Sequence, residues 1–245
     1  MSETARIWME VTFNVVYLIV VWGLVIVMAR RESAVAREDL RVARLIRWAF
    51  TFLALGDTGH VGFRVLAFAQ GDLGATISLL GREFGLVGLG ALSTAITVTI
   101  FYVLMLEIWR VRFDKKYGPF EYLLLAAAVL RLLIMIPAAN QWNNTVPPQP
   151  WSLYRNLPLT VLGLGIAYLI LRDARRAGDR PFVWIGISIL VSYAMYIPVI
   201  LFVQQVPTIG MLMIPKTMAY VAIGFIAYFS LYRQPAAVEE PATAG

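Results

Sequence analysis

LVGLGALSTAITVTIFYVLML, residues 86–106, contains no charged side chain. As a helix rising 1.5 Å per residue, such a stretch matches the hydrocarbon core of a bilayer, about 30 Å thick. The rest of the chain has the same character, because 60% of its 245 residues are apolar, 15% are charged and the mean hydropathy is +0.72. Soluble domains carry about 25% charged residues. The sequence therefore predicts an integral membrane protein and excludes a soluble or disordered one.

Outward from this stretch, the same length and apolarity predict an all-α, polytopic bundle of seven transmembrane helices. The predicted spans are Ile7–Ala29, Trp48–Gln70, Leu86–Trp109, Glu121–Trp142, Pro158–Leu171, Phe182–Gln204 and Thr208–Tyr232. They form one transmembrane domain, residues 1–233. Residues 234–245, rich in Ala, Pro and Glu, are expected to be a disordered cytoplasmic tail.

The 21 lysine and arginine residues indicate the orientation. Most of them gather in the linkers that follow the first, third and fifth spans, at residues 30–47, 110–116 and 172–180. By the positive-inside rule, these linkers and the C-terminus lie in the cytoplasm and the N-terminus lies outside. The net charge of +6 thus reflects topology and predicts no nucleic-acid partner.

The chain has no cysteine and one histidine, His60. It therefore has no disulfide, no thiolate metal site and no Cys nucleophile, and one chain cannot form a bis-His haem or multi-His zinc centre. We expect no metal and no cofactor.

Ionisable residues at bilayer depth cost about 2.5–3.5 kcal/mol each on insertion scales, so they indicate a polar interior. Asp57, His60 and Arg64 share one face of the second span, since they follow at i, i+3 and i+7. Arg131 lies near the middle of the fourth span, and Lys216 follows a proline in the last one. Asp57 beside His60 suggests proton coupling.

Further candidates lie near the outer ends of the spans. We expect them to meet the intramembrane residues at a cavity that opens outward, with Arg64, Arg131, Arg155, Lys216, Tyr196 and Tyr220 binding a ligand and Arg82 and Glu83 as secondary residues. Five cations then face two carboxylates, and this surplus favours an anion. The structural alternative is that internal ion pairs, for example Asp57–Arg131 and Glu83–Lys216, only hold the helices in register.

Three functions stay open. The leading one is binding or transport of a small anion or an anionic lipid headgroup, coupled to protonation of Asp57 and His60. The second is a metal-independent enzyme acting on a lipid or prenyl phosphate, with His60 as base, although Ser93 lacks a nucleophile elbow and no catalytic residue is assigned. The third is a structural or accessory membrane subunit. Membrane lipids are the expected partners, and the oligomeric state is open.

Much of spans two to seven resembles a group of uncharacterised bacterial multipass membrane proteins with no assigned activity. The resemblance rests on four strings: Gly56-Asp57-x-x-His60-x-x-x-Arg64, Thr97-x-Thr99-Ile100-Phe101-Tyr102-Val103-Leu104, Tyr154-Arg155-Asn156-x-Pro158 and Met211-Leu212-Met213-Ile214-Pro215-Lys216-Thr217. It implies a multi-pass protein of the bacterial inner membrane and nothing about chemistry.

A lysine in the seventh span also resembles the retinal proteins. In microbial rhodopsins a carboxylate typically stands four residues before that lysine, where this chain has Leu212. The middle of the third span, where another counterion is expected, offers only Ser93, Thr94 and Thr97. The sequence therefore disfavours a retinal-binding photoreceptor.

Overall fold

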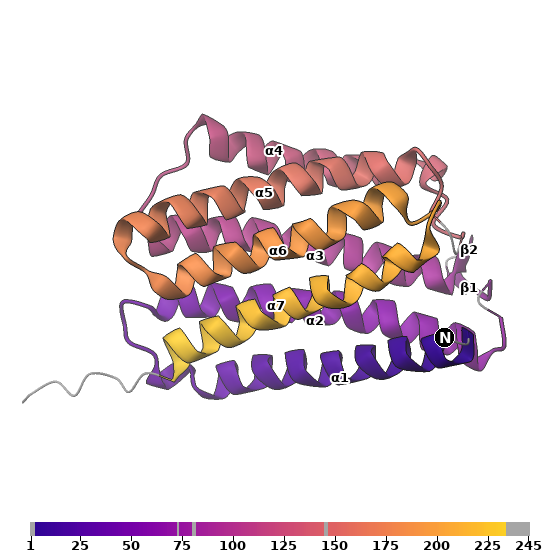
Figure 1. Ribbon diagram of the computed structural model, residues 1–245, viewed down its shortest axis with the longest axis horizontal. Coiled ribbons are helices and arrows are strands. Elements are labelled where there is room, and N and C mark those ends of the chain that lie inside the picture. The colour runs from indigo at the N-terminus through magenta and orange to yellow at the C-terminus, as the bar shows by residue number, and fades with distance from the viewer. Residues whose placement is uncertain (1–2, 73, 80–81, 145–146, 234–245) are drawn as a thin grey trace, which may run out of the picture.

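The computed structural model describes residues 3–72, 74–79, 82–144 and 147–233. Within these ranges, seven α-helices lie along the long axis of the molecule (Figure 1). They are α1 (Glu3–Arg30), α2 (Leu40–Ala69), α3 (Leu86–Arg112), α4 (Pro119–Ile134), α5 (Trp151–Ala177), α6 (Arg180–Phe202) and α7 (Met213–Ala227). Short 3-10 helices occupy Glu32–Ala34, Ala138–Asn140 and Pro207–Leu212, and a π-helical turn, Tyr228–Tyr232, ends the last helix. The predicted tail, 234–245, lies outside the described residues.

Five segments are long and apolar enough to cross a membrane, which indicates an integral multi-pass protein. They are Thr12–Arg30, Leu86–Arg112, Trp151–Ala177, Arg180–Phe202 and Pro207–Tyr232. The other two helices differ from the prediction of seven clear spans. α2 has 30 residues but carries several charges along its length, and α4 has only 16 residues. At 1.5 Å per residue α4 is about 24 Å long, shorter than a typical hydrocarbon core.

The predicted bounds of the fourth and fifth helices are wrong for reasons that involve proline. α4 ends at Ile134, before Pro137, and a 3-10 turn follows, whereas the prediction continued the helix to Trp142. α5 begins at Trp151 and contains Pro158 in its interior, whereas the prediction began the helix at Pro158. Proline in a helix removes one hydrogen bond, and in a membrane bundle neighbouring helices compensate for that loss.

A short β-hairpin, absent from the sequence prediction, connects α2 to α3. Strand β1 (Thr76–Leu79) pairs antiparallel with β2 (Arg82–Gly85). The side chain of Asn143, in the linker between α4 and α5, fixes the hairpin: its Oδ1 accepts from the Gly85 N–H at 3.1 Å, and its Nδ2 donates to the Glu83 carbonyl at 3.3 Å. These contacts join residues that are 58 and 60 positions apart in the sequence. The alternation of apolar and polar residues along the two strands could therefore not predict them.

Six of the helices pack in a closed ring, in the order α1, α2, α3, α5, α6 and α7, with α7 returning to α1. α4 lies outside the ring against α3 and α5. The core between them is aromatic, since Phe50, Phe101, Tyr102, Tyr193 and Tyr220 are all buried.

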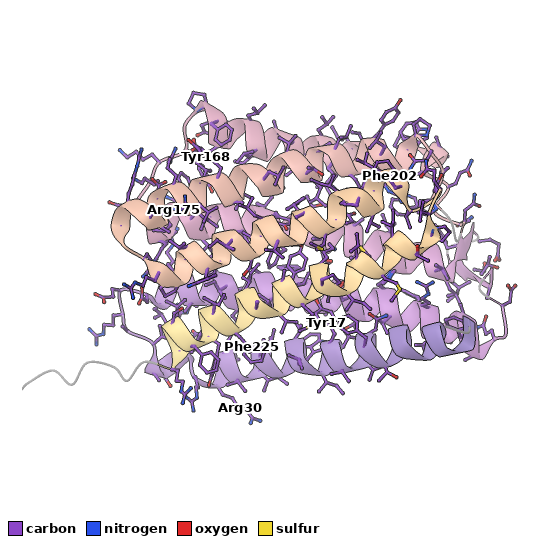
Figure 2. The ribbon with its side chains drawn as sticks, viewed as in Figure 1. Tyr17, Arg30, Tyr168, Arg175, Phe202 and Phe225 are labelled. Atoms are coloured by element: carbon purple, nitrogen blue, oxygen red, sulfur yellow. The ribbon has the colours of Figure 1, made fainter. Side chains whose placement is uncertain are left out.

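The two ends of the bundle differ (Figure 1). We name as the basic end the one with the α1–α2, α3–α4 and α5–α6 linkers and the end of α7, and as the hairpin end the one with β1, β2, the other linkers and the N-terminus. Figure 2 shows Arg30 and Arg175 at the basic end and Phe202 at the hairpin end. The arginine-rich linkers therefore share one end, as an alternating up-and-down topology requires.

Candidate binding site

Polar side chains from all seven helices lie inside the bundle. We call this set the interior cluster: Tyr17 of α1, Asp57 of α2, Thr94 and Thr99 of α3, Arg131 of α4, Arg155 and Asn156 of α5, Tyr196 of α6, and Lys216 and Tyr220 of α7. No described hydrogen bond or ring contact joins Tyr17, Asp57 and Thr94 to the others.

Asp57 is held by hydroxyl groups of neighbouring helices. The Tyr17 hydroxyl donates to its Oδ2 at 2.6 Å, and Thr94 lies 3.5 Å from its Oδ1. Tyr17 projects from the side of α1 that faces the rest of the bundle and is 5% exposed (Figure 2). Since a hydroxyl is a neutral donor, these contacts hold the carboxylate in place without cancelling its charge.

Arg131 is the most deeply buried charged side chain of the cluster, with 2% of its surface exposed. Its Nε donates to the Arg155 carbonyl at 3.1 Å, and its Nη1 donates to the Thr99 hydroxyl at 2.7 Å. Both acceptors are neutral. The guanidinium is therefore oriented by two helices and, among the described contacts, has no carboxylate partner.

Lys216 lies against aromatic rings. Its Nζ is 4.6 Å from the ring centroid of Tyr196 and 5.3 Å from that of Tyr220. The charge of Asp57 favours the ammonium and that of Arg131 opposes it, and no described salt bridge joins Lys216 to Asp57. Ring quadrupoles stabilise an ammonium by about 0.5–2 kcal/mol, less than a hydrogen-bonded carboxylate does.

Two consecutive residues of α5 connect the two cations. The Arg155 carbonyl accepts from Arg131, and the Asn156 Oδ1 accepts from the Tyr196 hydroxyl at 3.0 Å. The Tyr196 ring in turn lies beneath Lys216. The backbone of α5 therefore sets the position of Arg131 relative to Lys216.

The Arg155 side chain contacts the linker after α4. It is 7% exposed, its guanidinium carbon lies 4.3 Å from the centroid of the Trp142 ring, and its Nη1 lies 3.5 Å from the Asn140 Oδ1. The sequence placed Arg155 among the ligand-binding residues, and its described contacts are those of a structural anchor.

Several predicted residues lie apart from the cluster. Arg64 is exposed on α2. Glu83 is exposed on β2 and accepts from the Thr76 hydroxyl at 2.6 Å. Arg82 is also on β2, but its side chain lies outside the described residues. Among the cations whose side chains the structure describes, Arg64 is therefore exposed, whereas Arg131, Arg155 and Lys216 are buried or partly buried.

His60 is partly buried one turn from Asp57, but the two side chains do not hydrogen-bond. The His60 Nδ1 is buried without a described partner, and both oxygens of Asp57 are directed to Tyr17 and Thr94. The proposed ion pairs are also not formed, since the described salt bridges include neither Asp57–Arg131 nor Glu83–Lys216.

The described salt bridges all lie at the basic end. Glu107 accepts from Arg110 and Arg41, and it also accepts from the Tyr117 hydroxyl at 2.8 Å. Burial and this hydrogen bond raise the pKa of Tyr117 to about 12. The phenol thus stays protonated and donates at neutral pH.

A cleft of 590 Å³ opens at the same end, lined by Asp39, Arg112, Asp179, Phe182, Ser230 and Leu231 among others. It lies at the opposite end from the outward opening that the sequence predicted. The described His, Asp and Glu side chains form no group of three that could hold a metal ion.

The sequence did not mark Tyr17 or Asn156 as site residues. Tyr17 is an ordinary polar residue in an apolar span, and Asn156 precedes the predicted fifth span, whereas α5 begins at Trp151 and includes it. Thr99 is in an apolar span, where hydroxyls usually bond their own helix. It does so, donating to the Ala95 carbonyl at 2.8 Å, and it accepts from Arg131 as well.

Comparison with protein-family models, curated proteins and solved structures finds no match to this chain.

Proposed function

We propose that this multi-pass membrane protein binds a small anion, or the anionic headgroup of a lipid, at Arg131 and Lys216 in the interior cluster. The observation that carries the proposal is the environment of Arg131, which is 2% exposed and contacts only neutral oxygens among its described partners.

Charge balance supports an anion. A buried charge without a partner costs several kcal/mol, and proteins avoid that cost by pairing it. The carboxylate whose charge interacts with Lys216 is Asp57, and its oxygens accept from Tyr17 and Thr94. A bound anion would complete the charge balance, and a guanidinium held by its Nε and Nη1 still has further N–H groups to offer.

Proton coupling is part of the proposal and rests on Asp57. Its charge interacts with that of Lys216, so protonation of Asp57 would alter the field at the anion site. His60 contributes through its position on the same face of α2. The enzyme alternative needs His60 as a base that Asp57 orients, and no described contact joins the two side chains.

The test measures thermal stability of the purified protein in sodium chloride, acetate and phosphate against sodium gluconate at equal ionic strength. A ligand that binds only the folded state stabilises it by about 2.7 kcal/mol at one hundred times its Kd. We expect at least one small anion to raise Tm, Arg131→Met to abolish that rise, and the exposed-site control Arg175→Gln to retain it. Equal anion stabilisation of wild type and Arg131→Met would overturn the proposal.

Two further arms separate the related possibilities. Stabilisation by short-chain phosphatidylglycerol, but not by the salts, would assign the site to a lipid headgroup. Uptake of the labelled anion into proteoliposomes, with and without a pH gradient, would separate a transporter from a binding protein. Release of phosphate from a lipid phosphate would instead support the enzyme alternative and contradict the proposal.

A further inference from the structure

The cleft at the basic end lies between segments that are far apart in the sequence. Its walls come from the start of α2, the end of α3, the α5–α6 linker and the turn after α7. Ser230 and Leu231 line it; they belong to the π-helical turn that follows α7, and α7 itself carries Tyr220 and Lys216 of the interior cluster. Fifteen residues of helix span about 22 Å. The cleft thus lies about four turns of helix from Lys216, at the other end of α7.

Arg112 lines this cleft and contacts two linkers. Its Nε donates to the Asp179 Oδ2 at 2.7 Å, and its Nη1 donates to the Asp39 Oδ1. Its guanidinium carbon lies 5.2 Å from the centroid of the Phe182 ring. One side chain of α3 therefore connects the residue before α2 with the residue before α6.

Asp179 extends the connection into α6. Its other oxygen accepts from the Phe182 backbone N–H at 3.2 Å and so caps the first turn of α6. A shift of α6 away from α3 would have to break the contact of Arg112 with this capping residue. The charge-assisted bonds of Arg112 thus oppose separation of the helices around the cleft.

The neighbouring Arg110 provides the contrast. It donates to both oxygens of Glu107, one turn earlier in the same helix, at 2.5 and 2.6 Å. This pair lies within α3, and the other described contact of Arg110 is with the Tyr117 ring of the α3–α4 linker, so Arg110 joins neither of the two linkers that Arg112 joins. Among the described ion pairs, only that of Arg112 connects both the α1–α2 and the α5–α6 linkers to a third element.

We propose that the cleft is an inner entrance to the interior cluster, and that the contacts of Arg112 with Asp39 and Asp179 keep it closed. Arg112 is in this sense its latch, and breaking these two contacts extends the cleft along α7. The identity of the ligand that uses the entrance, a small anion or an anionic headgroup, rests on the proposed function. The opening of the entrance is independent of that function, because it can be measured with no anion ligand present.

The experiment uses single cysteines in this chain, which has none of its own. Ser230→Cys reports on the cleft, and Ala227→Cys reports on a position one turn deeper that is fully buried. Each is combined with Arg112→Gln or with the control Arg110→Gln in the full chain, purified in detergent. The measurement is the rate of labelling by a charged, water-soluble maleimide, after size-exclusion chromatography has shown a folded, monodisperse protein.

We expect the Ser230→Cys thiol to react in every background and the Ala227→Cys thiol to react only slowly when both arginines are intact. Arg112→Gln should raise the labelling rate at position 227 about tenfold or more, the effect of losing one charge-assisted bond on an opening equilibrium. Arg110→Gln should leave that rate unchanged. An equal rate at position 227 with and without Arg112, or an equal rise in both arginine variants, would overturn the latch.

If Arg112→Gln does not give a folded protein, the Ala227→Cys chain with Arg112 intact still decides the question. Raising sodium gluconate from about 0.05 to about 0.5 M screens partly exposed ion pairs. We expect faster labelling at position 227 with increasing salt, and no change would overturn the proposal. Failure of every anion to stabilise the protein would refute the proposed function and leave these rates unaffected.

Discussion

Arg131 shows how a single buried residue can distinguish a binding site from a structural ion pair. Its described contacts, the Arg155 carbonyl and the Thr99 hydroxyl, orient the guanidinium and leave its charge unbalanced within the described part of the chain. A side chain that only stabilised the bundle would be expected to face a carboxylate. The proposed anion site rests on this difference.

This interpretation predicts the stability of Arg131→Met. Replacing a buried charge that has no partner by an apolar side chain of similar length should change the free energy of unfolding by less than about 1 kcal/mol in gluconate, or increase it. A loss of about 3–5 kcal/mol is the result expected if Arg131 is half of a structural ion pair. Thermal unfolding of both proteins in gluconate makes the measurement.

Tyr17 and Asp57 give a second prediction at this scale. Tyr17→Phe removes the donor to a partly buried carboxylate and should cost about 1–3 kcal/mol. In a double-mutant cycle with Asp57→Asn, the two changes should show an interaction energy of about 0.5–3 kcal/mol, as groups in contact do. Additive effects would show that the 2.6 Å contact contributes nothing to stability.

Among the elements, α2 and α3 form the closest pair, and small residues allow their approach. A Cβ at Gly90 would lie 2.9 Å from the His60 Cα and 3.2 Å from the Gly59 carbonyl oxygen, both of them backbone atoms. A Cβ at Gly56 would collide with the Thr97 side chain. The hydroxyls of α3 near this contact therefore serve packing, as membrane helices with small interfacial residues commonly do.

Substitution at Gly90 tests the α2–α3 contact. Gly90→Ala should destabilise the protein by about 1–3 kcal/mol, because backbone atoms cannot rotate away from the added methyl group. Gly62→Ala on α2 is the matched control, since nothing lies within 4 Å of its added Cβ, and it should be neutral or stabilising by up to about 1 kcal/mol. Equal effects of the two changes in thermal unfolding would show that the helices separate easily.

Over the whole molecule, the two ends are built differently. Ion pairs hold the basic end together, and the hairpin end has prolines instead: Pro158 and Pro198 lie inside α5 and α6, and Pro215 lies in the first turn of α7. Pro158 and Pro198 each leave one backbone carbonyl without its helical N–H, whereas a proline in a first turn removes no such bond. The hairpin-end halves of α5 and α6 therefore have fewer internal constraints, and it is there that Asn156 and Tyr196 lie.

Orientation in the membrane is the prediction at this scale. In intact cells, single cysteines at residues 34, 118 and 177, all at the basic end, should resist a membrane-impermeant thiol reagent. Cysteines at residues 71 and 144, at the hairpin end, should react. A reactive residue at the basic end would reverse the topology that the positive-inside rule predicts.

The sequence by itself determined the membrane class, the seven helical segments and the gathering of arginines at one end, since each depends on composition and on local spacing. It could also mark Asp57, Arg131 and Lys216, because an ionisable residue in an apolar span is conspicuous wherever it lies. Only the tertiary structure decided which of them meet. A helix can turn any of its faces to any neighbour, so Tyr17 rather than Arg131 reaches Asp57, Arg64 stays exposed, and Arg112 joins two linkers that lie far apart in the sequence.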